Sequence, residues 1–523
     1  MKYKKNDDVK DNSRINNFIK NTVIGIISQF FSLILSFVSR TIFIKILSES
    51  YLGINGLFSN ILSTLSFIEL GFGTAIIYMM YKPVAERDKE RIKTLVNYYK
   101  QVYFKIGCAM LILGLMVIPF MKYIIKEPPL ISENLILIYI LFLINTCIGY
   151  FYSHKTAIIN ANQKNYIITL YNQIFKWIQL VFQIIILLVT HNYILYLLIQ
   201  ILCTFFNNIF ISIKADKMYP YIKEKKFEAI SNEDKENMNN KIKSLIFYKL
   251  NPSILNGSDN LILSAMVGVS MVGIYSNYYL ITNYLFLFLN QITSSLESSI
   301  GNLNSSAPKE KKEDIFYKVL FLCFLVYGIV SVLLMALVND FINIWIGEKY
   351  LFNNLIVFSI VLYLYVNGVC FACYSFRTTT GLFEKAKLVP LVEVVLNIAI
   401  SIVLVKIIGV SGVFFGTTIA RWLTFFWTDP KLLYNNLFEK NNIKKYFIKY
   451  FRYLFIVLFV GVCVFKISQF ILVDNYLFWF IKAIILSILT LFLFVLFTFK
   501  TVEFNYVYSL IKTKLFKRKE LQK

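Results

Sequence analysis

Fourteen apolar runs, each long enough to cross a bilayer, most constrain what this chain can fold into. A helix needs about 20 mainly apolar residues to cross roughly 30 Å of hydrocarbon. Of the 523 residues, 57% are hydrophobic and 16% are charged, which excludes a disordered chain and an ordinary soluble enzyme. The sequence predicts an all-α polytopic membrane protein with 14 transmembrane helices, at residues 21–47, 53–81, 101–121, 132–153, 166–189, 194–213, 244–267, 273–302, 319–338, 354–376, 388–407, 412–428, 453–469 and 476–499.

The distribution of positive charge predicts the topology. Lys and Arg number 42 in the termini and every second connection, three in the other connections and nine within the runs. Positive residues concentrate in cytoplasmic loops, so both termini are expected inside. The net charge of +24 is therefore assigned to these loops and not to nucleic-acid binding. The Lys-, Asn- and Ile-rich composition indicates a low-GC bacterium, so we expect a multi-pass protein of the bacterial plasma membrane.

An internal repeat predicts two matched halves. Residues 21–213 resemble residues 244–436 at an offset of about 220, and LSESYLGINGLF aligns with VGVSMVGIYSNY so that Gly53 falls on Gly273. Each half holds six spans, an even number, so the halves have the same orientation. This predicts two six-helix bundles related by a pseudo-two-fold axis along the membrane normal, an architecture found in alternating-access transporters.

The repeat also divides the chain. The match extends to Lys155-Thr-Ala, which corresponds to Arg377-Thr-Thr. The last two spans lie outside the repeat and look lipid-facing on most sides. The expected parts are a basic cytoplasmic N-terminus (1–20), the N-terminal bundle (21–213), a cytoplasmic linker (214–243), the C-terminal bundle (244–436), a basic connector (437–452), helices 13 and 14 (453–499) and a basic cytoplasmic tail (500–523).

Charged residues within the spans are the candidate functional groups. A charge at the bilayer centre costs at least about 2.5–3.5 kcal/mol, so it needs a partner or water. Lys482 lies toward an outer end, where a long side chain can reach the interface. Two interpretations stay open for the others: ion pairs that hold the bundle together, or a hydrated cavity with positive sites for an anion. The deep charges are Arg40, Glu69, Lys176, Asp259 and Arg421, with Lys249, Glu297 and Glu393 nearer the inner side.

Polar stripes accompany several of these charges. Spacings of three and four residues place each set on one helix face. Hydrocarbon does not solvate polar groups, so the stripes must face protein or water. Stripes of small polar residues also serve as helix-packing seams, and this alternative stays open. The stripes are Ser28, Ser32, Ser36 and Arg40; Asn172, Lys176, Gln179 and Gln183; Lys249, Ser253, Asn256 and Asn260; and Thr417, Arg421, Thr424 and Thr428.

Two short motifs give a family resemblance. The run Phe67-Ile-Glu-Leu-Gly-Phe-Gly-Thr-Ala-Ile resembles the second-span signature of prokaryotic polysaccharide transporters, and so does Asp259-Asn-Leu-Ile-Leu-Ser-Ala-Met-Val-Gly followed by Val272-Gly-Ile-Tyr-Ser. These are Wzx-type flippases of the multidrug/oligosaccharidyl-lipid/polysaccharide (MOP) exporter superfamily. The resemblance implies a non-enzymatic carrier with a central cationic cavity. Its implied cargo is an undecaprenyl-pyrophosphate-linked oligosaccharide, moved from the inner to the outer leaflet by alternating access.

Site roles follow from the resemblance and the charges together. Arg has a planar fork that suits phosphate oxygens, and only eight Arg stand against 46 Lys. Arg40 matches the basic residue that lipid II flippases keep in the first span, whereas the eighth span has no basic residue. We expect Arg40, Arg421, Lys176 and Lys249 to bind the pyrophosphate, and Glu69, Asp259 and Glu297 to serve in coupling or gating.

Other assignments stay open. A lipid II flippase and, less favoured, a cation-coupled multidrug exporter are alternatives from the same superfamily. A membrane glycan polymerase or glycosyltransferase is the alternative from another class, although the short outer loops leave little room for catalytic groups. No catalytic motif, metal site or cofactor is expected. An ion gradient (H⁺ or Na⁺) or the membrane potential is the candidate energy source, membrane lipids are the other partners, and a monomer is expected.

Overall fold

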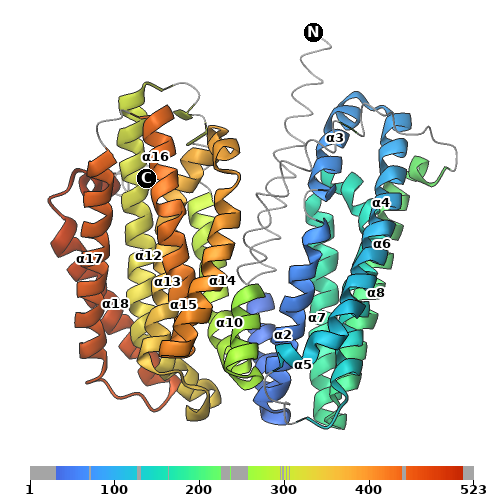
Figure 1. Ribbon diagram of the computed structural model, residues 1–523, viewed down its shortest axis with the longest axis horizontal. Coiled ribbons are helices and arrows are strands. Elements are labelled where there is room, and N and C mark those ends of the chain that lie inside the picture. Colours follow the sequence, from blue (N-terminus) through green and yellow to red (C-terminus); the bar gives the residue numbers. More distant parts are fainter. Residues whose placement is uncertain are drawn as a thin grey trace, which may run out of the picture. The chain divides into compact units, whose positions relative to one another are not determined.

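The chain is all-helical. A computed structural model describes residues 31–69, 72–125, 131–162, 164–224, 236, 257–294, 296, 300–301, 303–304, 307–438 and 443–509. Every regular element in these ranges is a helix. The all-α prediction is confirmed. The chain divides into two compact units, Met1–Gly273 and Ile274–Lys523 (Figure 1).

The first unit is a bundle of apolar helices whose polar ends are capped. Asn134 and Asn192 stand before two of its long helices, and each side-chain oxygen accepts a hydrogen bond from a backbone N–H of the first turn. The described elements are a helix over residues 31–46, α2 (Glu49–Leu65), η1 (Ser66–Glu69), α3 (Phe72–Glu86), α4 (Lys89–Val117), η2 (Ile118–Phe120), α5 (Met121–Ile124), α6 (Leu135–Ala161), α7 (Asn165–Thr190), α8 (Tyr193–Met218), η3 (Pro220–Lys223) and a helix over residues 257–266.

The second unit is built around α12. Figure 1 shows α12 beside α13, with α17 and α18 on one side of this pair and α14 and α15 on the other. Fully buried aromatic side chains such as Phe316, Phe321 and Tyr327 fill its core. The elements are α10 (Val269–Ser294), which begins in the first unit, α12 (Lys309–Ile346), η4 (Glu348–Tyr350), α13 (Asn354–Thr379), η5 (Leu382–Ala386), α14 (Val389–Ile408), α15 (Ser411–Leu423), α16 (Phe425–Asn436), α17 (Ile443–Ser468) and α18 (Tyr476–Thr498).

Nine helices within the described ranges are long and apolar enough to cross a membrane. They correspond to nine of the fourteen predicted spans, and the chain is a multi-pass membrane protein. The other five predicted spans are 21–47, 53–81, 244–267, 273–302 and 412–428. The 53–81 span is interrupted by η1, and the 412–428 span is divided at Thr424 into α15 and α16. The remaining three lie partly outside the described residues, so the count of fourteen stays a prediction.

The two repeat-related glycines, Gly53 and Gly273, lie at one helix crossing. A Cβ on Gly53 would stand 2.1 Å from the carbonyl oxygen of Val269, and a Cβ on Gly273 would stand 2.4 Å from that of Glu49. Neither distance leaves room for a methyl group, so the backbones meet where α2 and α10 begin. Small residues permit such close backbone approach between membrane helices.

The structure corrects the prediction for Lys482. Lys482 is buried, and its Nζ lies 2.7 Å from Asp340 of α12 and 2.9 Å from the carbonyl oxygen of Ile471. The side chain therefore turns into the protein and not toward the interface. The sequence could not reveal this partner, because Asp340 is 142 residues away.

Candidate functional site

Arg40 lies on the 31–46 helix, whose position is fixed by polar contacts with α7. Ser32 Oγ donates a hydrogen bond to Gln173 Oε1 at 2.5 Å and accepts one from Trp177 Nε1 at 3.2 Å. Arg40 lies two turns further along the same helix and is half-buried. The helix that carries Arg40 is thus held against α7 within the first unit.

Lys176 is the twelfth of the 26 residues of α7, near its middle. Its side chain is exposed, and it forms no ion pair with any residue of the described ranges. A mid-span ammonium in hydrocarbon would carry the full insertion cost. Lys176 lies between Gln173 and Trp177 and is therefore level with Ser32. Arg40 stands eight residues beyond Ser32, about 12 Å along the helix axis.

The rest of the α7 polar stripe packs against α8. Gln179 Nε2 donates to Gln183 Oε1 at 3.3 Å, and Gln183 Nε2 donates to the carbonyl oxygen of Tyr196 at 3.1 Å. Asn172 Oδ1 accepts a hydrogen bond of 2.8 Å from Asn207. These three residues behave as a packing seam. Lys176 is the charged member of the stripe, and its side chain lies outside this seam, at the surface.

Arg421 forms a buried ion pair in the second unit. Its Nε lies 2.7 Å from Glu393 Oε1, and the Glu393 side chain is completely buried. Its Nη1 also donates to Asn367 Oδ1 of α13. Of the two interpretations of the deep charges, Arg421 fits the ion pair that holds the bundle together. Phosphate binding by Arg421 stays a prediction.

The α14–α15 hairpin places these charges opposite one another. Glu393 faces Arg421, Asn397 donates to Thr417 at 2.7 Å, and Ser401 donates to the carbonyl oxygen of Val413 at 3.2 Å. From one pair to the next, the residue on α14 is four positions later and the residue on α15 is four positions earlier, as expected for antiparallel helices. Gly416 allows the close approach, because a Cβ there would stand 2.2 Å from Ser401 Oγ. The pairs form one continuous polar seam.

Glu69 lies in η1, at the break within the 53–81 span. Tyr103 Oη of α4 donates to Glu69 Oε1 at 2.6 Å, and the Tyr99 and Tyr103 rings meet edge to face at 4.3 Å. A Cβ on Gly73 would stand 2.7 Å from Tyr103 Oη, so glycine lets the hydroxyl fit against α3. The carboxylate is held by phenols and not by a cation in the contacts described here.

Asp259 lies in a polar, tightly packed segment of the first unit. Ser258, Asp259 and Asn260 are all buried. A Cβ on Gly257 would stand 1.9 Å from Thr64 Oγ1, and Ser264 Oγ donates to the carbonyl oxygen of Ile124 at 2.9 Å. The 257–266 helix is therefore seated against α2 and the end of α5.

Two predicted site residues, Lys249 and Glu297, lie outside the described residues. Sequence reasoning missed the roles of Asn367, Tyr103 and Tyr196. Tyrosine carries no signal in a chain with 35 of them. The hairpin register was readable, because Glu393, Asn397 and Ser401 recur every four residues before the turn at Gly409. Among the described residues no group of three or more His, Cys, Asp and Glu could hold a metal ion.

Comparison with known proteins reveals a shared fold. A multidrug resistance MATE family transporter of the MOP superfamily, in an inward-facing conformation, matches with a TM-score of 0.63 and 15% identity, over 79% of this chain and 96% of its own. Lipid II flippase MurJ, in an inward closed conformation, matches with a TM-score of 0.61 and 15% identity, over 91% of this chain and 98% of its own. A point mutant of the Vibrio cholerae MATE transporter VcmN matches with a TM-score of 0.54 and 13% identity, over 82% and 99%.

These neighbours define the class of fold, which is that of the MOP-superfamily transporters. No protein-family model matches the chain. No curated protein matches it in sequence either. At identities of 13–15% the likeness extends to the fold alone, and the Wzx-type assignment stays a prediction.

Proposed function

We propose that this protein is a flippase for an undecaprenyl-pyrophosphate-linked oligosaccharide, the repeat unit of a capsule, O-antigen or other surface polysaccharide. The observation that carries the proposal is Lys176, an exposed charge near the middle of a membrane-length helix, without an ion pair among the described residues. A charge at this depth needs water or an anionic ligand. The likeness in fold to a lipid II flippase, which spans 91% of this chain, supports the same class of cargo.

The chemistry of the cargo explains the requirement for cations. A pyrophosphate and its sugars cannot enter hydrocarbon, whereas a polyprenyl tail can remain there throughout. Arg40 would hold phosphate oxygens through its planar fork, and Lys176 would act as a point charge. Their separation of about 12 Å along the helix axis suits an extended head group better than a single phosphate. Arg421 and Lys249 stay as predicted contributors.

Replacing Arg40 by glutamine is expected to lower the initial transport rate about tenfold or more. A charge-assisted contact contributes about 1.5–3 kcal/mol, and each 1.4 kcal/mol is a factor of ten. The measurement uses proteoliposomes with undecaprenyl-pyrophosphate carrying one fluorescent N-acetylglucosamine. Arrival in the opposite leaflet is followed with a membrane-impermeant quencher. Arg452→Gln is the matched control, because Arg452 is an exposed arginine of α17.

The outcome for Arg40 separates binding from folding. Membrane abundance and thermal stability of Arg40→Gln should match those of Arg452→Gln. Transport by Arg40→Gln at the wild-type rate would refute its role in binding the cargo. Loss of transport together with loss of folded protein would assign Arg40 a structural role instead.

Glu69 is proposed as the coupling carboxylate. Glu69→Gln keeps a group that can accept the Tyr103 hydroxyl but removes the charge that a coupling ion would neutralise. We expect this variant to transport at the same rate with and without an imposed H⁺ or Na⁺ gradient, whereas the wild type accelerates. Glu348→Gln, at an exposed carboxylate of η4, should keep the wild-type response. Wild-type transport that persists after collapse of all ion gradients would remove the idea.

A multidrug exporter is the second candidate, because a MATE transporter matches the fold with a TM-score of 0.63. Cationic drugs favour an acidic binding site, whereas Arg40 and Lys176 are basic. Drug sensitivity of a deletion strain tests this candidate, and unchanged sensitivity is expected. Lipid II in the same proteoliposomes tests the peptidoglycan alternative. A polymerase or glycosyltransferase would lengthen or transfer the glycan, which the liposome assay would detect as a new product.

A further inference from the structure

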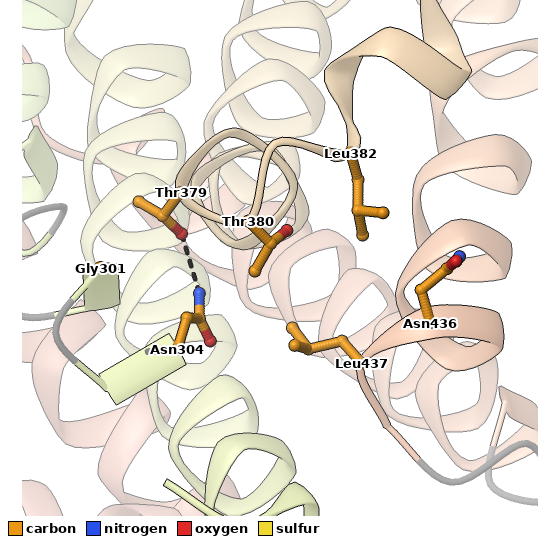
Figure 2. Close-up of a pocket in the computed structure, with 7 residues that line it drawn as sticks. All are labelled: Gly301, Asn304, Thr379, Thr380, Leu382, Asn436 and Leu437. Atoms are coloured by element: carbon orange, nitrogen blue, oxygen red, sulfur yellow. Dashed lines mark hydrogen bonds between the residues drawn. The ribbon is translucent and has the colours of Figure 1, made fainter. Parts of the chain in front are cut away.

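A polar pocket lies within the second unit, where α13 ends and α16 approaches its last turn. Its volume is about 310 Å³, which is within the usual range of small-molecule sites. Figure 2 shows Asn304 and Thr379 pointing toward one another, with Thr380 and Leu437 beside them. The lining residues are Gly301, Asn304, Thr379, Thr380, Leu382, Asn436 and Leu437.

Both threonine hydroxyls in the pocket already donate their protons to backbone carbonyl oxygens. Thr379 Oγ1 donates to the carbonyl oxygen of Ser375, and Thr380 Oγ1 donates to that of Phe376, each at 2.7 Å. These are bonds to the preceding turn of the same helix. Each hydroxyl oxygen therefore faces the pocket with lone pairs only. Toward a ligand, the two threonines are acceptors.

Asn304 adds an acceptor that has no partner in the described part of the chain. Its Nδ2 donates to Thr379 Oγ1 at 2.8 Å, and this fixes the amide orientation because the Thr379 proton is already used. Its Oδ1 is buried and accepts no hydrogen bond from any described residue, while the whole residue is only 9% exposed. A buried acceptor left unsatisfied costs about 1–3 kcal/mol, so a ligand that donates to it would be favoured.

The opposite wall carries a positive charge. Lys385 Nζ donates to Asn436 Oδ1 at 2.6 Å, and Asn436 Nδ2 donates to the carbonyl oxygen of Leu432 at 2.7 Å. Asn436 therefore has little to offer a ligand by itself. The ammonium beside it would repel a metal cation. A bare anion is disfavoured as well, because the Asn304 side presents mainly acceptors and keeps only the second N–H of the Asn304 amide as a donor.

These features select a neutral ligand that carries hydroxyl donors. A sugar ring presents such donors at its edge and C–H groups on its face, and Leu382 and Leu437 provide apolar surface for that face. The volume also exceeds what a single ion fills. The pocket fits a neutral sugar residue in donors, acceptors and size.

The internal repeat shows that packing alone does not demand hydroxyls here. Thr379 and Thr380 correspond to Ala157 and Ile158 of the first half, in the match of Lys155-Thr-Ala to Arg377-Thr-Thr. Both Ala157 and Ile158 are fully buried. The equivalent position is thus filled by apolar packing in one half and opened into a polar pocket in the other.

We propose that this pocket binds a neutral sugar residue through Asn304 Oδ1 and the Thr380 hydroxyl. The proposal rests on the proposed function, because a lipid-linked glycan supplies such a residue. The pocket lies at the end of α13 that carries Arg377, the side on which the basic loops place the cytoplasm. It would therefore receive the sugar before transport begins.

The test measures saturation-transfer NMR signals from simple sugars on the full chain in phospholipid nanodiscs, which avoids sugar-based detergents. The probes are the methyl glycosides of glucose, rhamnose and N-acetylglucosamine. We expect a signal for at least one of them, and about a fivefold weaker affinity in Thr380→Val and Asn304→Leu, since one hydrogen bond contributes about 1 kcal/mol. Thr378→Val is the matched control, because Thr378 donates to Tyr374 and does not line the pocket.

A third variant guards against misfolding. A Cβ on Gly301 would have ordinary contacts, the nearest at 3.8 Å from Thr379, so Gly301→Leu adds volume to the wall without removing a hydrogen bond. It should abolish the signal while keeping the wild-type melting temperature. Equal signals in the wild type and all three pocket variants, or no signal with any glycoside, would overturn the proposal. So would stabilisation by NaCl or KCl that Asn304→Leu removes, which would identify a cation site.

Transport measured on the same preparations separates this proposal from the previous one. If the protein transports the lipid-linked cargo but gives no glycoside signal, the sugar-binding pocket is refuted and the proposed flippase function is not. If glycosides bind in a way that depends on Asn304 and Thr380, but no lipid-linked cargo is transported, the sugar-binding pocket is supported and the proposed flippase function is refuted.

Discussion

Replacing Glu393 by leucine is expected to remove most of the folded protein, and replacing Arg421 by methionine as well is expected to restore it. The single variant Glu393→Leu removes the carboxylate from a completely buried position and leaves the Arg421 guanidinium beside it. Removing one member of a buried pair costs about 3–5 kcal/mol, whereas replacing both by apolar residues is often neutral. Yield and melting temperature of the monodisperse protein after size exclusion are the measurements.

The comparison of the single and double variants of Glu393 and Arg421 also decides what Arg421 does in transport. The single variant Arg421→Met should lose stability too, because it leaves Glu393 buried without its partner. A folded double variant that transports at the wild-type rate would make Arg421 structural. A folded double variant that does not transport would give Arg421 the predicted role in pyrophosphate binding. Equal yields of the single and double variants would contradict the assigned ion pair.

Replacing Gly53 by alanine is expected to have a similarly large effect on folding. The added Cβ would stand 2.1 Å from the backbone oxygen of Val269, and a backbone atom cannot turn aside as a side chain can. Overpacking commonly costs about 1–3 kcal/mol and more where backbones must separate. We expect a large loss of monodisperse protein, and the same for Gly273→Ala at the repeat-related position.

Gly149→Ala is the control for the glycine crossing. Gly149 lies within α6, and a Cβ there meets nothing within 4 Å. Alanine is favoured over glycine in a helix by about 0.8–1.0 kcal/mol, so this variant should be as stable as the wild type or more so. If Gly53→Ala behaved like Gly149→Ala, the close approach of α2 and α10 at this point would be refuted.

Much of the fold was predictable because membrane helices follow composition. Hydrocarbon tolerates only segments that satisfy their own backbone hydrogen bonds, so apolar length alone locates most helices. The breaks were harder to predict. The 53–81 and 412–428 runs carry polar residues at the breaks, Glu69 in η1 and Arg421 and Thr424 at the second, but no proline within either run marks the change of backbone. The repeat match of Gly53 to Gly273 predicted equivalence, but the contact at their crossing appeared only in the structure.

The candidate site was less predictable, because charges are paired by tertiary contacts. The sequence sorted Arg421, Lys176 and Lys482 by depth in their spans but could not tell which of them has an ion-pair partner. The structure gives Arg421 and Lys482 carboxylate partners, at 28 and 142 residues of separation. The nearer pair follows from the α14–α15 hairpin register, whereas the distant one depends on how α18 packs against α12. The resemblance to polysaccharide transporters gave the class of cargo and could not supply these pairings.

The contrast between α12 and the 53–81 span has a mechanical consequence. Over its 38 residues α12 extends about 57 Å without interruption, and its one glycine, Gly328, is packed against Val457 and Phe494. An uninterrupted helix of this length is expected to move as one rigid body, so that a displacement at one end is passed to the other. The 53–81 span is broken at η1, so a displacement of α2 is not passed to α3 along one continuous helix axis, and the carboxylate of Glu69 lies at that break.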